Sequence, residues 1–307
     1  MDITATLKTF SKFTVLHSQY QNAINTIMTS MQTTAECGEP SCPMLMGESG
    51  TGKSSICNRL VQLLGPPTPV LKVEGLVTSL PCLYLELPSR PTINSVAAAI
   101  LDRMEVSTGG KGPELQQRIL ATLQSRDTRL VILDEFQNFA NKGAEKTKVE
   151  TCNWIKYMLN QSRITFLLSG EPINKKIITP FTQLSARYPY RISLSDLAYS
   201  ADPHSEFRTI LALLSAELVK LGELHSDLFL ADEHMSAAIY MASGGNMRCI
   251  RRLLHGAFKR SLLRGDGTLT NLDFSSTLQE LDLSARIQKK INPFLINTKE
   301  ICKVISR

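Results

Sequence analysis

The chain has 307 residues, of which 43% are hydrophobic and 20% are charged, so it can bury the cores of about two domains. It contains no run of eighteen uncharged apolar residues, and residues 1–13 lack the apolar centre of a signal peptide, so neither a membrane span nor export is expected. The seven cysteines are scattered and odd in number, which is typical of reduced thiols in a cytoplasmic protein.

The net charge is +6, and the excess lies towards the C-terminus. Residues 245–307 hold twelve Lys and Arg against five Asp and Glu, a balance of +7. Within them, the stretch from Arg248 to Arg264 carries six basic residues and no acidic one. Such a block attracts phosphate backbones or an acidic partner, and it equally suits one solvated face of a helix.

The first 42 residues precede the main motif of the chain. Apolar residues at helical spacing between Tyr20 and Met31 predict one helix, preceded by a short lead-in. Gly38, Pro40 and Pro43 then indicate a loop.

The next stretch matches G-x-x-x-x-G-K-[ST], the pattern of a phosphate-binding loop. Its residues are Gly47, Glu48, Ser49, Gly50, Thr51, Gly52, Lys53 and Ser54. Glycines let backbone N–H groups face a triphosphate, Lys53 would reach the β- and γ-phosphates of ATP, and Ser54 would ligate Mg²⁺. A short apolar strand before the loop and an amphipathic helix after it fit this interpretation. The alternative is a glycine-rich turn with Lys53 on a solvated face.

The segment from Gly65 to Pro81 is rich in proline and is predicted to be an irregular insertion. A strand is expected over 82–87, and helices over 93–104 and 114–123. The apolar run 130–133 then ends in Asp134 and Glu135. At the carboxyl end of a buried parallel strand, Asp134 would hold Mg²⁺ and Glu135 would polarise the attacking water.

A further strand over 164–168 ends at Ser169, which is our candidate for sensing the γ-phosphate. A fifth strand over 190–194 follows Arg187, and the chain then becomes helical over 207–221, 233–241 and 247–263. We therefore predict a lead-in and helix (1–42), an α/β nucleotide-binding domain (43–198), a helical lid (199–284) and a basic C-terminal tail (285–307).

This order of motifs resembles the AAA+ ATPases, and within them it is most similar to the TniB/TnsC-like transposition ATPases. The resemblance covers roughly residues 40–265. The motifs that carry it are the phosphate loop, the segments 133–137, 168–172 and 183–187, and Gly244-Gly245-Asn246-Met247-Arg248 in the predicted lid. The resemblance implies an AAA+ P-loop NTPase with a parallel five-stranded sheet followed by a small all-helical lid.

The resemblance also implies roles for two arginines. Arg187 matches the arginine finger, which reaches the γ-phosphate held by the neighbouring subunit, and a guanidinium fork suits charge developing on a transferred phosphoryl group. Arg248 matches the second sensor of the lid, which contacts phosphate within the same chain. At the first sensor position, where Asn or Thr is common, this chain has Ser169.

Proteins of this kind assemble on double-stranded DNA as ATP-dependent rings or helical filaments, and they link a target-selection protein to a transposase. The resemblance therefore implies a homo-oligomer, and contacts to the DNA backbone, since any target sequence must be accepted. Basic residues in loops after the second strand, Arg90, Lys111 and Arg118, are candidates for these contacts. They equally suit solvated loops.

Three other functions remain open at this stage. A replication initiator or helicase loader shares the same motifs, although the forty or so residues after the predicted lid are too few for an added winged-helix domain. A signalling or scaffold ATPase would use nucleotide only to hold its shape, which Glu135 and Arg187 argue against. A metabolic kinase would need an acceptor site, for which the sequence has no sign.

Overall fold

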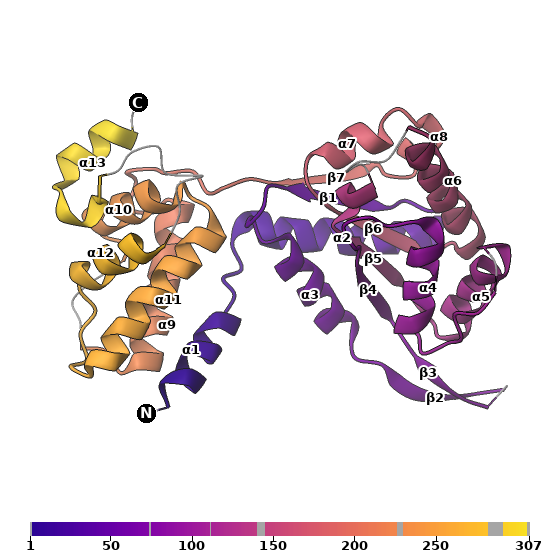
Figure 1. Ribbon diagram of the computed structural model, residues 1–307, viewed down its shortest axis with the longest axis horizontal. Helices are drawn as coiled ribbons and strands as arrows, with labels where there is room; N and C mark the ends of the chain where they lie inside the picture. Colours follow the sequence, from indigo (N-terminus) through magenta and orange to yellow (C-terminus); the bar gives the residue numbers. More distant parts are fainter. Residues whose placement is uncertain are drawn as a thin grey trace. The chain divides into compact units, whose positions relative to one another are not determined.

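The computed structural model describes residues 2–73, 75–110, 112–139, 145–225, 230–281 and 291–305. The chain forms two compact units. One is Gln19–Leu194, and the other joins Met1–Ser18 to Ser195–Arg307. The first unit holds the main sheet and the second is helical (Figure 1).

A parallel sheet of five strands, in the order β4-β5-β6-β1-β7, forms the centre of the α/β unit. The strands are β1 (Pro43–Gly47), β4 (Cys82–Glu86), β5 (Leu130–Asp134), β6 (Thr165–Gly170) and β7 (Tyr190–Leu194). β1, β5 and β6 are buried along their whole length, which explains their nearly continuous apolar sequences. The predicted α/β fold with a parallel five-stranded sheet is confirmed.

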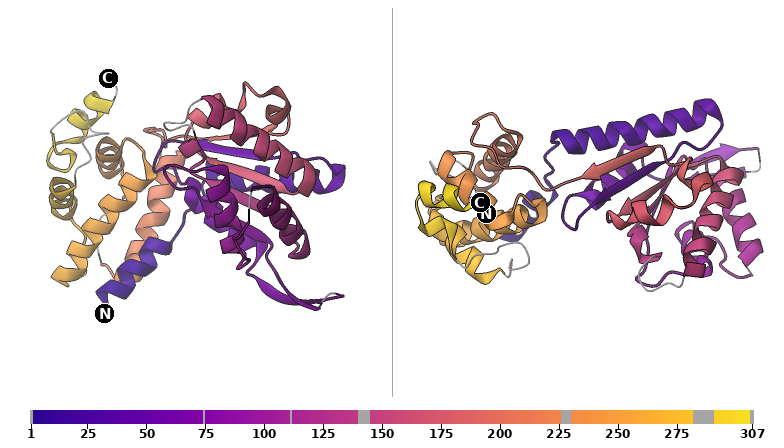
Figure 2. Two further views of the ribbon diagram at one scale, coloured as in Figure 1. Left: turned by 45° about the vertical axis from the view of Figure 1, so that its right-hand side comes forward. Right: turned by 90° about the horizontal axis from the view of Figure 1, so that it is seen from above.

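Helices cover both faces of this sheet (Figure 2). They are α2 (Ser18–Cys37), α3 (Lys53–Leu64), α4 (Ile93–Arg103), α5 (Gly112–Ser125), α6 (Glu145–Ser162), α7 (Ile173–Ile178), α8 (Thr182–Ser185) and the 3₁₀ turn η1 (Phe136–Phe139). Strand residues alternate between two cores. Leu45, for example, packs with α2 and α3, whereas Met44 packs with α4, α5 and α6.

The segment after α3 differs from the prediction. Instead of an irregular insertion, it forms an antiparallel hairpin of β2 (Thr68–Lys72) and β3 (Gly75–Ser79), visible in Figure 1. The prolines of this segment concealed the hairpin in the sequence. Of these prolines, only Pro69 lies in one of the two strands. Both strands of a two-stranded hairpin are edge strands, where the missing N–H of a proline is tolerated. Lys72 anchors the ribbon by donating to the Ser125 carbonyl (2.7 Å) and to Asp127 (2.8 Å) at the end of α5.

The helical unit is built from α1 and the C-terminal part of the chain. Its elements are α1 (Ile3–Lys12), α9 (Glu206–Gly222), α10 (Glu233–Ser243), α11 (Met247–Arg264), α12 (Asn271–Glu280), the 3₁₀ turn η2 (Pro293–Leu295) and α13 (Thr298–Ile305). Among the described residues, no helix is long and apolar enough to cross a membrane.

Two further segments pack into this helical unit. From the sequence, they are predicted to be a lead-in and a basic tail. Phe10 of α1 lies edge-on to Phe258 of α11 (5.7 Å between centroids), and the Arg251 guanidinium lies 4.5 Å from the Phe10 ring centre. Near the other end of the chain, Phe294 stacks on Phe274 of α12 (5.3 Å), and Ile301 of α13 is fully buried. Residues 291–305 therefore belong to the packed unit, while residues 282–290 lie outside the described residues.

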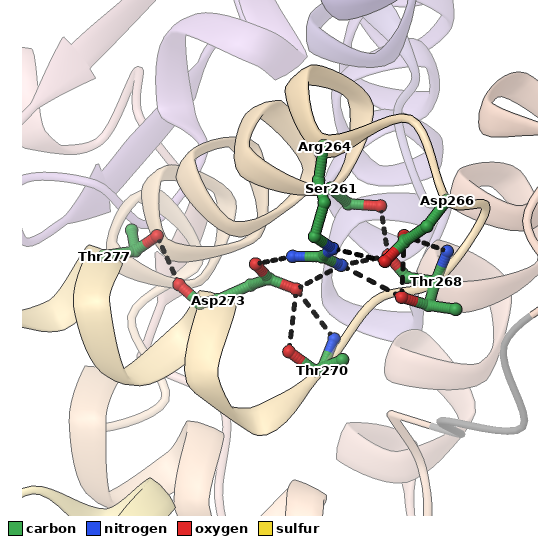
Figure 3. A network of polar contacts seen from close by, with 7 residues as sticks. All are labelled: Ser261, Arg264, Asp266, Thr268, Thr270, Asp273 and Thr277. Carbon is green, nitrogen blue, oxygen red and sulfur yellow. Dashed lines mark hydrogen bonds and ion pairs between the residues drawn. The ribbon is translucent and has the colours of Figure 1, made fainter.

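A polar network around Arg264 joins the end of α11 to the start of α12 (Figure 3). Arg264 donates to both carboxylate oxygens of Asp273, at 2.6 and 3.1 Å, and to Asp266 at 2.6 Å. Asp273 is buried and also accepts from the backbone N–H and hydroxyl of Thr270, which caps α12. Hydrogen bonds from Arg264 and then Thr268 lower the pKa of Asp266 to about 2, so its contact persists until the pH falls towards that value.

We expect Asp273→Ala to lower the free energy of unfolding by about 1–3 kcal/mol, because it removes a helix cap and the buried partner of Arg264. Asp266→Ala is the matched control, and its effect should be smaller because that carboxylate is solvent-exposed. Chemical denaturation of the full chain measures both. Equal stability of Asp273→Ala and the wild type would contradict this account of the network.

Candidate nucleotide-binding site

The phosphate loop lies between β1 and α3, at the carboxyl edge of the sheet. Gly50 and Gly52 have φ values of 89° and 103°, a left-handed region that glycine enters without steric cost. A Cβ added to Gly47 would approach Thr51 Oγ1 to 2.6 Å and the Leu194 carbonyl to 2.9 Å, so this position also requires glycine. The loop leads directly into the first turn of α3, whose free N–H groups favour an anion.

Lys53 is nearly buried at this loop, with 7% of its surface exposed. Its ammonium donates to the carbonyl oxygens of Gly47 (2.6 Å) and Glu48 (3.1 Å). Among the described residues, its hydrogen-bond partners include no carboxylate. A buried cation that is held only by carbonyl groups is well placed to receive a negatively charged ligand.

The carboxylate of Asp134, at the end of β5, joins the elements of the site. Its Oδ2 accepts hydrogen bonds from Ser54 Oγ of α3 and from Tyr84 OH of β4, both at 3.0 Å. Its Oδ1 accepts from Ser169 Oγ of β6 (2.6 Å) and from the Glu135 N–H (3.0 Å). Asp134 is 1% exposed, and these four donors satisfy its buried charge.

Tyr84 acts as a donor because its phenol stays protonated. Burial, followed by the charge of Asp134, raises the pKa of Tyr84 above its usual range. The sequence does not reveal this role, because one tyrosine in an otherwise apolar strand gives no indication of which carboxylate it faces.

Glu135 is held in an unusual backbone conformation beside Asp134. Its φ is 58°, a left-handed value that costs a residue with a side chain roughly 1–2 kcal/mol. The buried Gln137 side chain donates to the Glu135 carboxylate, and its own oxygen accepts from the Glu171 N–H at 3.0 Å. A Cβ on Gly170 would approach that oxygen to 2.2 Å, so glycine is needed there. Gln137 thus orients Glu135, a role that sequence reasoning did not assign.

The donors of this site fit a nucleoside triphosphate with Mg²⁺. The Ser54 hydroxyl and the Asp134 carboxylate lie 3.0 Å apart and are the hard oxygen ligands that Mg²⁺ prefers. A Cβ on Gly52 would meet nothing within 4 Å, so there is open space beside the loop. Lys53 and the start of α3 supply the positive character that phosphate groups require.

The structure brings together the predicted residues Lys53, Ser54, Asp134, Glu135 and Ser169. Arg187 lies elsewhere in the same unit, at the amino end of β7. β7 runs parallel to β1, with Tyr190 opposite Pro43 and Leu194 opposite Gly47. Five strand residues, or roughly 16 Å, therefore separate the edge that carries Arg187 from the phosphate loop.

The remaining predicted residues lie outside this group. Arg248 is in the first turn of α11, after Asn246, whose side chain caps that helix. Arg90 is exposed in the loop after β4. Arg118 of α5 donates to the carbonyl oxygens of Ser107 (2.7 Å) and Gly109 (2.6 Å). Lys111 lies outside the described residues.

The parallel sheet, the phosphate loop and the acidic strand end together form the AAA+ P-loop NTPase fold. Solved structures with the same fold include the ORC2 protein of Aeropyrum pernix in ADPNP–ADP complexes (TM-score 0.61, 17% identity, 85% of this chain and 67% of that chain). The ORC1 protein of the same organism, in complex with DNA, has a TM-score of 0.60 at 18% identity over 89% of this chain and 68% of that chain. For Cdc6p of Pyrobaculum aerophilum the TM-score is 0.59 at 16% identity, over 85% of this chain and 66% of that chain.

The chain belongs to the TniB family. The family model described as bacterial TniB protein matches residues 9–194, which is more than half of the chain. This match confirms the family resemblance inferred from the motifs. No curated protein has a sequence significantly similar to this one.

We expect Lys53→Ala to weaken the binding of ATP with Mg²⁺ by about tenfold to a hundredfold, because a charged hydrogen-bond donor to phosphate contributes about 1.5–3 kcal/mol. Titration calorimetry or a fluorescent ATP analogue measures this. Lys176→Ala, on the exposed face of α7, is the matched control and should bind as the wild type does. Unchanged affinity of Lys53→Ala would contradict the assignment of the site.

Proposed function

We propose that this protein binds ATP and Mg²⁺ at the phosphate loop, hydrolyses the ATP, and uses this cycle to control its assembly on double-stranded DNA. The observation that carries the proposal is the hydrogen-bonded group around Asp134. It places the Ser54 hydroxyl, the Ser169 hydroxyl and the start of Glu135 around one buried carboxylate.

Each residue of the site has a distinct role in hydrolysis. Lys53 and the loop amides bind the phosphates. Ser54 and Asp134 would hold Mg²⁺, which would neutralise part of the phosphate charge when bound. Glu135, kept in place by Gln137, orients and polarises the attacking water. Ser169 senses the γ-phosphate and at the same time holds Asp134. Arg248 acts as a second phosphate contact from the helical lid.

The position of Arg187 supports an oligomer. It lies at the edge of the sheet opposite the phosphate loop, too far for its side chain to reach a nucleotide bound to the same unit. Its guanidinium is oriented by Asn160 Oδ1 (2.9 Å) and the Gln183 carbonyl (2.7 Å). We therefore infer that Arg187 completes the site of a neighbouring copy, within a hexameric ring or a helical filament.

The proposals of DNA binding and of a role in transposition are supported by membership of the TniB family and not by the site itself. A regulator of this kind would connect a target-selection protein to a transposase, with ATP favouring the assembled state and hydrolysis dismantling it. Arg90 and Lys111 are the candidate contacts to phosphate. Arg118 fits this role less directly, because its guanidinium also holds the loop before α5.

A second candidate function is favoured by the structural neighbours. ORC1, ORC2 and Cdc6p share the fold, so a replication initiator or helicase loader remains the alternative. The two functions differ in whether the protein acts together with a transposase during target selection. Such a requirement would favour the transposition regulator over the replication initiator or helicase loader. A nucleotide-dependent scaffold without hydrolysis is disfavoured by the oriented Glu135.

We expect Glu135→Gln to bind ATP with nearly unchanged affinity but to lower turnover at least a hundredfold, because the amide cannot polarise water. Gln137→Ala should give a smaller loss, since Glu135 keeps its carboxylate but loses its orientation. Phosphate release measures turnover, and fluorescence anisotropy measures the lifetime of the complex with labelled DNA.

If ATP hydrolysis controls release from DNA, a second result is expected for Glu135→Gln. With ATP, Glu135→Gln should remain on DNA long after the wild type has dissociated. If Glu135→Gln hydrolyses ATP at the wild-type rate, the proposed hydrolytic role is wrong. If it is inactive yet leaves DNA as fast as the wild type, hydrolysis does not control assembly.

A further inference from the structure

Three arginines lie along the amino edge of the parallel sheet. Arg129 directly precedes β5, Arg163 lies two residues before the start of β6, and Arg187 lies three residues before β7. Because these strands are parallel, their amino ends meet at one edge, opposite the phosphate loop. The chain therefore presents a basic edge and a phosphate-binding edge on opposite sides of one sheet.

Two neighbouring cavities open along this basic edge. One, of about 650 Å³, is lined by Arg129 and Arg163, together with residues of α2. The other, of about 380 Å³, is lined by Arg163 and Arg187, together with the loop before β1 and Asn160. Arg163 thus belongs to both cavities and shares one of them with the residue inferred to act on a neighbouring copy.

The two arginines of the smaller cavity differ in how they are held. Asn160 and Gln183 orient the Arg187 guanidinium, as described above. The Arg163 guanidinium has no hydrogen bond or ion pair within the described part of the chain. The acidic residue of this cavity, Glu39, is exposed and has no ion-pair partner among the described residues. Two cations and one carboxylate line this cavity, which leaves it with a positive balance.

The backbone at Arg163 places its side chain at this edge. Its N–H donates to the Leu159 carbonyl (3.0 Å) and closes α6, and its φ of 54° is left-handed. Glycine or asparagine usually occupies such a helix end, because other side chains cost roughly 1–2 kcal/mol there. β6 and β7 are separated only by β1, so their amino ends are about 10 Å apart. Side chains as long as arginine can converge across that distance on one anion.

We propose that Arg163 acts together with Arg187 on the terminal phosphates of the nucleotide held by a neighbouring copy of this chain. This inference rests on the proposed function, in which Arg187 acts between subunits. The ligand is a polyphosphate anion, which would offset the mutual repulsion of two guanidinium groups in one cavity. Arg187 supplies an oriented fork, and Arg163 supplies one that becomes ordered only when the phosphate arrives.

The test is Arg163→Gly, which removes the guanidinium but relaxes the left-handed backbone, so a loss of activity cannot be attributed to a strained fold. We expect turnover to fall at least tenfold, with ATP affinity of the isolated chain unchanged. Arg163→Lys keeps the charge without the fork and should recover only part of the rate. Arg103→Ala, an exposed arginine at the end of α4, is the control and should turn over as the wild type does.

Mixing subunits distinguishes a role between copies from a role within one chain. Each variant should have low turnover alone, but Arg163→Gly retains Glu135 and Glu135→Gln retains Arg163. If Arg163 acts on the neighbouring site, their mixture should regain several-fold more turnover than either variant by itself. Wild-type turnover of Arg163→Gly, or no recovery on mixing, would overturn the inference.

The same mixing experiment with Arg187→Ala separates this inference from the function on which it rests. Recovery with Arg187→Ala but not with Arg163→Gly would reject the role of Arg163 and leave the shared site intact. If Arg187→Ala also fails to recover, or loses no activity at all, the proposed completion of the site by a second copy is itself wrong.

Discussion

The site of this protein depends on one buried carboxylate, that of Asp134. A charge with 1% exposure is unfavourable unless it is fully hydrogen-bonded, and its four donors come from α3, β4, β6 and the adjoining Glu135. Satisfying this charge therefore fixes the start of the phosphate loop helix, two neighbouring strands and the backbone of Glu135 relative to one another. The carboxylate that stabilises the local fold is also a ligand suited to Mg²⁺.

Parallel strands give the sheet two chemically different edges. The carboxyl edge collects the phosphate loop, Asp134, Glu135 and Ser169, which form the candidate nucleotide-binding site. The amino edge collects Arg129, Arg163 and Arg187, on the side of the sheet opposite the phosphate loop. Under the proposed function, a single copy would hold both halves of a hydrolytic site on opposite sides, which would couple assembly to ATP binding.

Features that depend on neighbouring residues in the chain could be predicted from the sequence. The phosphate loop, the Asp134–Glu135 strand end and the five parallel strands all follow from short patterns of glycine, apolar and acidic residues. Features that depend on distant contacts did not follow. The packing of Phe10 against Phe258, and the hydrogen bonds from Tyr84 and Gln137, join residues whose proximity no local pattern reports. The β2–β3 hairpin was missed because prolines obscured the alternation of its strands.

We propose that ATP, held between copies of the chain, drives assembly on DNA. Electron microscopy of the protein with double-stranded DNA and a non-hydrolysable ATP analogue tests it most directly, with Lys53→Ala prepared in parallel. The account predicts regular rings or filaments around the DNA that are absent with Lys53→Ala, and in which Arg187 of one copy faces the phosphate loop of the next. Protein that binds the analogue but remains monomeric and separate from DNA would contradict it.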